Sequence, residues 1–178
     1  MISNSNDKIK LRTIEYDDLL TIQQWRNQKS IQPFVREYRE LSLKHVTNWY
    51  ESTVVDNKFE FFMIEDDNIR IGITGLTYID WVNKNADLHL AIYQNNVWID
   101  EYYAPNVLSV MLEHAFNFLN LEKIYVEVYE IDNKKIDFFT SNGFIQDAIL
   151  RNHRYYNGSY INSLILSILK KEFNEKRK

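Results

Sequence analysis

The chain has 178 residues, 45% of them hydrophobic and 26% charged, which suits one globular domain with its own core and excludes a disordered segment. The net charge of −4 argues against a nucleic-acid partner, because the phosphate backbone attracts basic surfaces. The chain has no cysteine, which excludes disulfides and thiolate sites, and the spacing of its four histidines predicts no metal site.

The N-terminal part of the chain predicts one strand and then two helices. Charged and apolar residues alternate over KIKLRTI, residues 8–14, as in a half-buried strand. Apolar residues at three- and four-residue spacing then predict two helices, with Pro33 interrupting the segment between them. These helices are 17–27, with Asp17 or Asp18 as N-cap, and 42–53, with Ser42 as N-cap.

From residue 58 onward the hydrophobic period is two, which predicts three antiparallel strands joined by turns at 66–68 and 83–85. Asn157-Gly158 near the end of the chain is a strong signal for a hairpin turn. The predicted ranges are strands 58–66, 69–82 and 86–93, helix 105–118, strand 123–131, helix 132–143 with Asp132 or Asn133 as N-cap and Gly143 as its stop, and strands 144–156 and 159–169.

This element order predicts a mixed α/β fold of the α+β type. A helix between two strands indicates a crossover with parallel pairing, whereas the hairpins are antiparallel. We therefore expect a mostly antiparallel central sheet of about seven strands, flanked by helices.

Several phrases, with this order, resemble the GNAT acyl-CoA N-acyltransferases, in the branch of ribosomal-protein N-terminal and spermidine acetyltransferases. The phrases are WRN (25–27), ADLHL (86–90), LNLEKIYVEVYEIDNKKIDFFTSNGF (119–144) and LRNHRYYNGSYINSLILSIL (150–169). The likeness implies the acyl-CoA N-acyltransferase fold as a single domain over 1–178, with its core at about 8–173, and acetyl-CoA as co-substrate.

In this family a glycine-rich turn after the fourth strand holds the pyrophosphate of acetyl-CoA at a helix N-terminus, where free N–H groups attract an anion. The likeness sets IDEYYA, residues 99–104, on that turn, with Tyr102 at an expected glycine. The carboxylates of Asp100 and Glu101 would repel the pyrophosphate unless they point into water. The implied contacts from this segment are Tyr102, Tyr103, Ala104 and Asn106.

The resemblance also implies the groups that carry the chemistry. Asp87 matches the acidic residue of the fourth strand and is the candidate base, or else a polar residue on a solvated face. His89 shares its face by alternation and could titrate near neutral pH, or be structural. The backbone N–H of Ile92 or Tyr93 is the implied oxyanion donor. Asn133 is an implied cofactor contact or a helix cap. Phe139 stands where the family has a tyrosine that acts as general acid, and it has no proton to donate.

The N-terminal helices match the acceptor side of the family, which implies substrate contacts at Trp25, Arg26, Asn27 and Phe34. The leading hypothesis is transfer of an acetyl group to a primary amine: an amino sugar, a polyamine or a protein N-terminus. The second hypothesis is a catalytically impaired fold that serves as a binding module. It rests on Tyr102, Phe139 and the acids of the turn.

The chain start lacks the apolar core of a signal peptide, and no apolar run approaches the ~20 residues that span a bilayer. We therefore expect a cytoplasmic protein without a membrane partner. The apolar INSLILSIL near the C-terminus permits a homodimer, and it equally suits a central strand.

Overall fold

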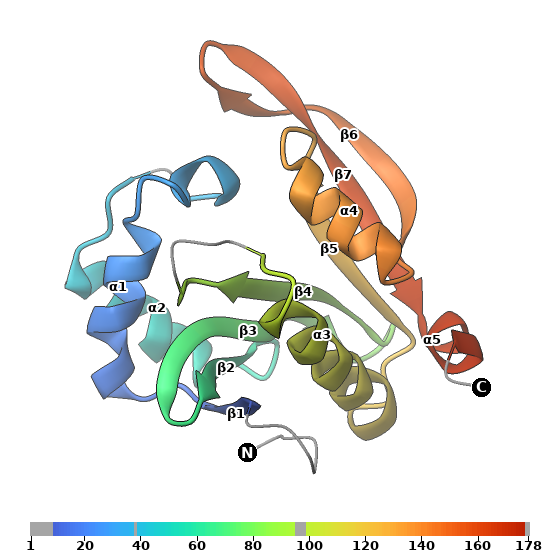
Figure 1. Cartoon of the computed structure of the whole chain (residues 1–178), viewed down its shortest axis with the longest axis horizontal. Helices are drawn as coiled ribbons and strands as arrows, with labels where there is room; N and C mark the ends of the chain where they lie inside the picture. The colour runs from blue at the N-terminus through green and yellow to red at the C-terminus, as the bar shows by residue number, and fades with distance from the viewer. Residues whose placement is uncertain (1–8, 38, 95–98, 177–178) are drawn as a thin grey trace.

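The computed structural model describes residues 9–37, 39–94 and 99–176 and contains one seven-stranded sheet, ordered β1-β2-β3-β4-β5-β7-β6 (Figure 1). β4 and β5 run parallel and the other neighbouring pairs are antiparallel, which confirms the predicted mixed sheet. The strands are β1 Ile9–Thr13, β2 Glu60–Asp66, β3 Ile69–Asp80, β4 Asn85–Ile92, β5 Lys123–Tyr129, β6 Ile145–Tyr156 and β7 Ser159–Leu169.

Helices cover both faces of the sheet, with α1 and α2 on one face and α3 and α4 on the other (Figure 1). The helix predicted over 105–118 begins earlier, at Tyr103, and its last turn is π-helical. Among the described residues, no helix has the length and apolar character to cross a bilayer. The helices are η1 Tyr16–Asp18, α1 Leu19–Arg26, η2 Gln32–Phe34, α2 Leu43–Thr53, α3 Tyr103–Glu113, η4 His114–Phe118, α4 Asn133–Ser141 and α5 Lys170–Lys176.

The two faces of the sheet carry two separate hydrophobic cores, and β4 contributes to both. Leu88 and Leu90 lie in the core beneath α3 and α4, whereas Ala91 lies in the core beneath α1 and α2. Side chains alternate between the faces of a strand, so Asp87 and His89 lie on the same face as Ala91, as predicted. This places both candidate catalytic side chains on the side of α1 and α2.

The helix caps follow the predictions in part. Ser42 caps α2, because its hydroxyl accepts a hydrogen bond from the His45 N–H. For α4 the cap is Asp132, whose carboxylate accepts from the Lys135 N–H at 3.1 Å. Asn133 is the first residue inside that helix and exposed, so it does not act as the N-cap.

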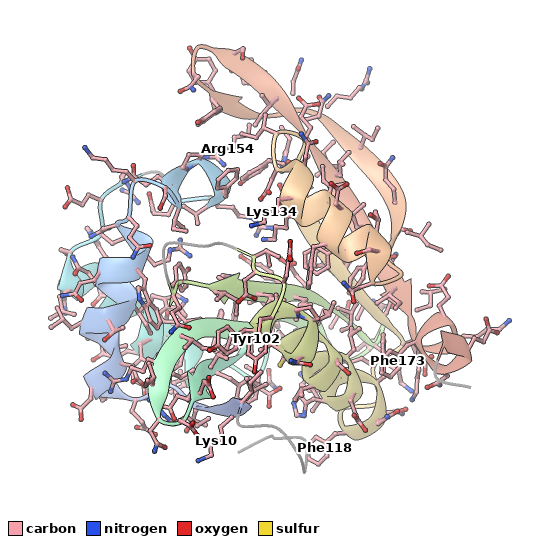
Figure 2. All side chains as sticks on the ribbon, viewed as in Figure 1. Lys10, Tyr102, Phe118, Lys134, Arg154 and Phe173 are labelled. Carbon is pink, nitrogen blue, oxygen red and sulfur yellow. The ribbon has the colours of Figure 1, made fainter. Side chains whose placement is uncertain are left out.

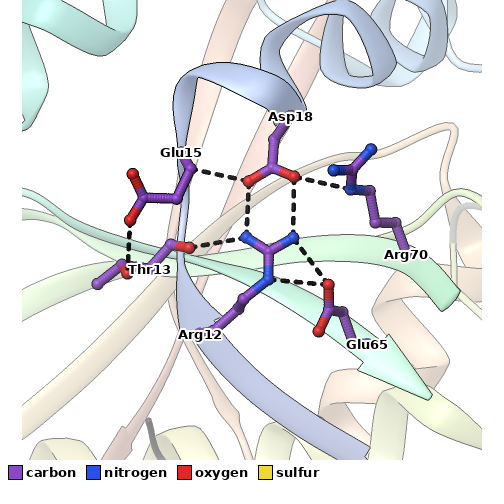
Figure 3. Close-up of polar contacts among 6 residues, drawn as sticks. All are labelled: Arg12, Thr13, Glu15, Asp18, Glu65 and Arg70. Carbon is purple, nitrogen blue, oxygen red and sulfur yellow. Dashed lines mark hydrogen bonds and ion pairs between the residues drawn. The ribbon is translucent and has the colours of Figure 1, made fainter. Parts of the chain in front are cut away.

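Asp18 is the N-cap residue of α1, as predicted, but its side chain makes no capping hydrogen bond to that helix. Its buried carboxylate instead accepts hydrogen bonds from both terminal nitrogens of Arg12, at 2.7 and 2.9 Å, and forms an ion pair with Arg70 Nε at 2.7 Å (Figure 3). Arg12 also donates to Glu65 on β2. Burial raises the pKa of Asp18, but the hydrogen bonds and charges of its partners outweigh burial and lower it overall. The cluster therefore ties the entry of α1 to three neighbouring strands.

We expect Asp18→Asn to destabilise the fold by about 3 kcal/mol, because removing the charge leaves Arg12 partly buried without its main partner. Urea unfolding followed by tryptophan fluorescence measures this loss. The matched control is Asp17→Asn, an exposed neighbour whose replacement should change stability by less than about 0.5 kcal/mol. Equal unfolding midpoints for the two variants would remove Asp18 from its structural role.

Candidate active site

The candidate site lies where β4 and β5 part. The two strands pair over three positions, Asn85 with Lys123, Ala86 with Ile124 and Asp87 with Tyr125, and the pairing ends there. β4 stays paired with β3, and β5 stays paired with β7. Figure 2 marks the N-terminal ends of α3 and α4 with Tyr102 and Lys134, and both ends lie on the side where the strands diverge.

Two adjoining cavities occupy the side of this splay that faces α1 and α2. One, of about 390 Å³, is lined by Asp87 and His89 of β4 and Glu127 of β5. The other, of about 370 Å³, lies beneath α1 and α2 and has mostly apolar walls. Arg26, Trp49, Phe61 and His89 line both cavities, so together they form one cleft.

Asp87 is the buried carboxylate at the point where the strands separate. Its side chain is 12% exposed, and its Oδ2 lies 3.4 Å from Nη2 of Arg36. Burial raises the pKa of Asp87 to about 6. The positive charges of Arg36 and Lys135 lower this pKa, and the negative charge of Glu127 raises it, but burial has the largest effect. A carboxylate with this pKa is ionised at neutral pH and can still accept a proton, as a general base must.

Glu127 faces Asp87 across the splay, although the sequence did not single it out. Its Oε2 accepts from Arg36 Nη2 at 2.7 Å, and its Oε1 lies 3.0 Å from His153 Nδ1 on β6. The strict alternation of β5 offered a signal, because it sets Glu127 on the face opposite the core residues Val126 and Val128.

His89 lies in the cleft but does not titrate near neutral pH, contrary to expectation. Burial, with the positive charges of Arg26, Lys135 and Arg36, lowers the pKa of His89 to about 3. Its ring makes an edge contact with Phe61 on β2, at 5.9 Å between centroids. His89 is therefore neutral at physiological pH and a weaker base than Asp87.

Lys135 is a second functional candidate that the sequence reading missed. It lies in the first turn of α4 and lines the cleft with Asp87 and Glu127. Burial lowers the pKa of Lys135 to about 8, against the opposing influence of Asp132 and Asp87. The cleft thus holds an acid and a base whose pKa values both lie near neutrality.

The backbone of β4 distinguishes the two expected oxyanion donors. The Tyr93 N–H donates to the Ile71 carbonyl at 2.8 Å and is not available to a ligand. N–H groups alternate along a strand, so the Ile92 N–H is directed away from β3 and into the splay. Ile92 remains the expected donor, while the Tyr93 side chain is buried and stacks on Trp25.

The glycine-free turn brings an acidic side chain to the start of α3. Asp100 Oδ1 accepts hydrogen bonds from the N–H groups of Tyr103, at 2.9 Å, and Ala104, at 2.8 Å. One oxygen of this half-buried carboxylate therefore holds the donors that the resemblance assigns to a pyrophosphate. The Tyr103 hydroxyl donates to Asp66 on β2, and Asn106 Nδ2 donates to the Tyr102 carbonyl.

Two expected cofactor contacts differ in their accessibility. Asn133 is exposed at the start of α4, where it can still meet a cofactor. Phe139 is fully buried and packs against Phe138 and Phe144. Its ring is part of the core beneath α4, so it presents no surface to a ligand in this structure.

The four expected substrate residues fall into two groups. Arg26 and Phe34 line the cleft. Trp25 packs on Tyr93, and Asn27 exchanges hydrogen bonds with the backbone of Leu41, at 2.8 Å for each bond. Trp25 therefore packs α1 against the end of β4, and Asn27 fixes the segment between α1 and α2, whereas the cleft walls described above are formed by other residues.

Known proteins are similar in sequence to this chain over most of its length. A spermidine N(1)-acetyltransferase of Vibrio cholerae is 25% identical over 169 residues, which cover 94% of this chain and 96% of that protein. The corresponding Escherichia coli K12 enzyme is 24% identical, over 95% of this chain and 90% of its own.

Solved structures show the same fold. The Vibrio cholerae spermidine N-acetyltransferase in complex with CoA and spermine superposes with a TM-score of 0.85 at 24% identity, over 94% of this chain and 98% of that chain. A dodecameric structure of that enzyme gives a TM-score of 0.80 at 22% identity, over 96% and 99%. Residues 11–165 match the acetyltransferase (GNAT) domain, and the chain therefore belongs to the GNAT family of acetyl-CoA-dependent N-acetyltransferases.

Proposed function

We propose that this acetyltransferase modifies a terminal primary amine of a polyamine such as spermidine. The observation that carries the proposal is the pair of buried carboxylates, Asp87 and Glu127, on opposite sides of the splay. Two carboxylates in a partly desolvated cleft attract an ammonium group strongly. The names of the relatives from Vibrio cholerae and Escherichia coli, both spermidine N(1)-acetyltransferases, support the same acceptor class.

The binding-module hypothesis finds less support. It rested on the loss of the tyrosine acid at Phe139 and on the altered turn. However, the cleft still holds a carboxylate with a raised pKa and a lysine with a lowered pKa. Perturbed titratable groups gathered in one cleft are typical of catalysis.

In the proposed reaction the acceptor enters as an ammonium and transfers a proton to Asp87. The free amine then attacks the thioester carbonyl of acetyl-CoA, and the Ile92 N–H stabilises the developing oxyanion. The C–S bond breaks, and the CoA thiolate takes up a proton donated by Lys135, while the attacking nitrogen releases its second proton, which returns to the neutral Lys135 amine directly or through water. His89 stays neutral and forms part of the wall.

Three earlier expectations remain predictions beside this proposal. Contacts of acetyl-CoA with Tyr102, Asn106 and Asn133 rest on the family resemblance. A cytoplasmic location is likewise expected. Assembly into a homodimer is supported by the edge strand β6, which is exposed along most of its length.

We expect the purified protein to acetylate spermidine faster than glucosamine or a peptide N-terminus, measured by CoA release at saturating acetyl-CoA. Asp87→Asn should lower kcat by about 100-fold or more, because the base is lost. An equal rate for all three acceptors would contradict the polyamine proposal.

The pH profile tests Asp87 separately. A base with a pKa of about 6 is protonated below that pH, so kcat/KM should fall about tenfold for each pH unit below 6. This acid limb should be absent from the residual activity of Asp87→Asn. An unchanged limb in the variant would assign it to another group.

Lys135→Met should move the acid limb to higher pH. The ammonium of Lys135 lowers the pKa of Asp87, so removing the charge raises that pKa further. The profile of kcat/KM for spermidine measures the shift. Lys134→Met is the matched control: it removes the exposed neighbouring lysine and should leave the limb in place. Shifts of equal size in both variants would indicate a general charge effect.

Asp100→Asn should tighten acetyl-CoA binding severalfold, measured by calorimetric titration. The amide oxygen can still cap α3, but the negative charge at the two N–H groups is gone. Glu101→Gln removes a neighbouring exposed charge and is the control for electrostatics alone. Identical affinities of Asp100→Asn, Glu101→Gln and the unmodified chain would show that the pyrophosphate does not use this helix end.

A further inference from the structure

Arg36 places a cation between the two carboxylates of the cleft. Its Nη2 lies 2.7 Å from Glu127 Oε2 and 3.4 Å from Asp87 Oδ2. The side chain of Arg36 is 55% exposed, whereas those of Asp87 and Glu127 are 12% and 10% exposed. Two buried like charges on facing strands are unfavourable without a counter-ion. The guanidinium is thus the exposed counter-ion of two largely buried carboxylates.

Interactions other than those with Arg36 also hold the two carboxylates in position. Glu127 also contacts His153 Nδ1 on β6, and that same Nδ1 lies 2.9 Å from Ser163 Oγ. Asp87 lies at the last paired position between β4 and β5, where the sheet fixes its backbone. The carboxylate pair therefore keeps its place when Arg36 moves away.

The segment that carries Arg36 is anchored just before it. Arg154 on β6 donates to the carbonyls of Pro33, at 2.5 Å, and Gln32, at 3.3 Å. Its guanidinium lies over the Tyr129 ring, at 4.3 Å from the centroid. Figure 2 shows Arg154 between the β6–β7 hairpin and the η2 turn. The anchor fixes the η2 turn over the cleft and leaves the Arg36 side chain able to turn outward.

A primary ammonium carries the same charge as the guanidinium, is smaller, and donates three hydrogen bonds. We propose that the Asp87–Glu127 pair is the ammonium subsite for the acceptor and that Arg36 is its internal occupant, which the acceptor must displace. Acceptor binding is then an exchange of cations that leaves the cleft charge unchanged. A neutral acceptor would gain nothing from displacing Arg36. This inference rests on the proposed acetylation of a polyamine and names the residue that sets its acceptor affinity.

The test compares Arg36→Ala and Arg36→Lys with the unmodified enzyme, using spermidine and acetyl-CoA. Arg36→Ala should lower the KM for spermidine about two- to fivefold, because no internal cation competes with the acceptor. Arg36→Lys retains a cation and should keep a KM close to that of the unmodified enzyme. The control Arg151→Ala removes an exposed arginine of β6 that lies outside the cleft and should leave KM unchanged.

Binding measured without turnover separates this inference from the proposed function. Spermidine is titrated into protein saturated with CoA, which cannot donate an acetyl group. Tighter binding to Arg36→Ala supports the subsite even if no polyamine is acetylated, and in that case the proposed function fails alone. Unchanged or weaker binding to Arg36→Ala overturns the inference, whatever the activity of the unmodified enzyme.

Discussion

The short parallel pairing between β4 and β5 is the constraint on which the cleft depends. Each strand remains bonded to its outer neighbour, so the sheet divides into two halves that diverge beyond Asp87 and Tyr125. Beyond that point, within the part of the chain that the structure describes, the N–H groups of β4 that face the splay, including that of Ile92, are not paired with a strand. The splay therefore creates both a cavity and a row of donors, and the polar side chains of β4 and β5 meet across it.

Desolvation sets the chemistry of the groups that meet there. Burial is the largest influence on Asp87, His89 and Lys135, and in each case it disfavours the charged form. It raises the pKa of the carboxylate and lowers the pKa of the lysine, so the two values approach each other around neutrality. The same burial removes His89 from acid–base work. One physical effect thus assigns different roles to three neighbours.

Local patterns in the sequence were sufficient to predict the sheet and the two β4 side chains that line one wall of the cleft. Period-two alternation predicted the strands and set Asp87 and His89 on one face, because a strand's faces follow from its own residues. Arg36 and Lys135 could not be found in this way, since their partners lie on other elements and meet them only in the folded chain. The ion pairs of Asp18 were missed for the same reason: its partners Arg12 and Arg70 are brought to it by the sheet.

The glycine-free turn and the acceptor side of the cleft share one feature: at each, an internal charged group holds the polar groups that are proposed to bind a substrate. At the start of α3 the donors of Tyr103 and Ala104 are held by Asp100, and in the cleft the carboxylates of Asp87 and Glu127 are held by Arg36. On the proposed roles of these two places, each carries an internal group with the same charge as the substrate group that it would bind. On this proposal, both places hold an internal partner for their charges before the substrates arrive, and each substrate displaces an internal group when it binds. Such a site favours ligands whose charge matches the group they replace, so charge selects the substrates before shape does.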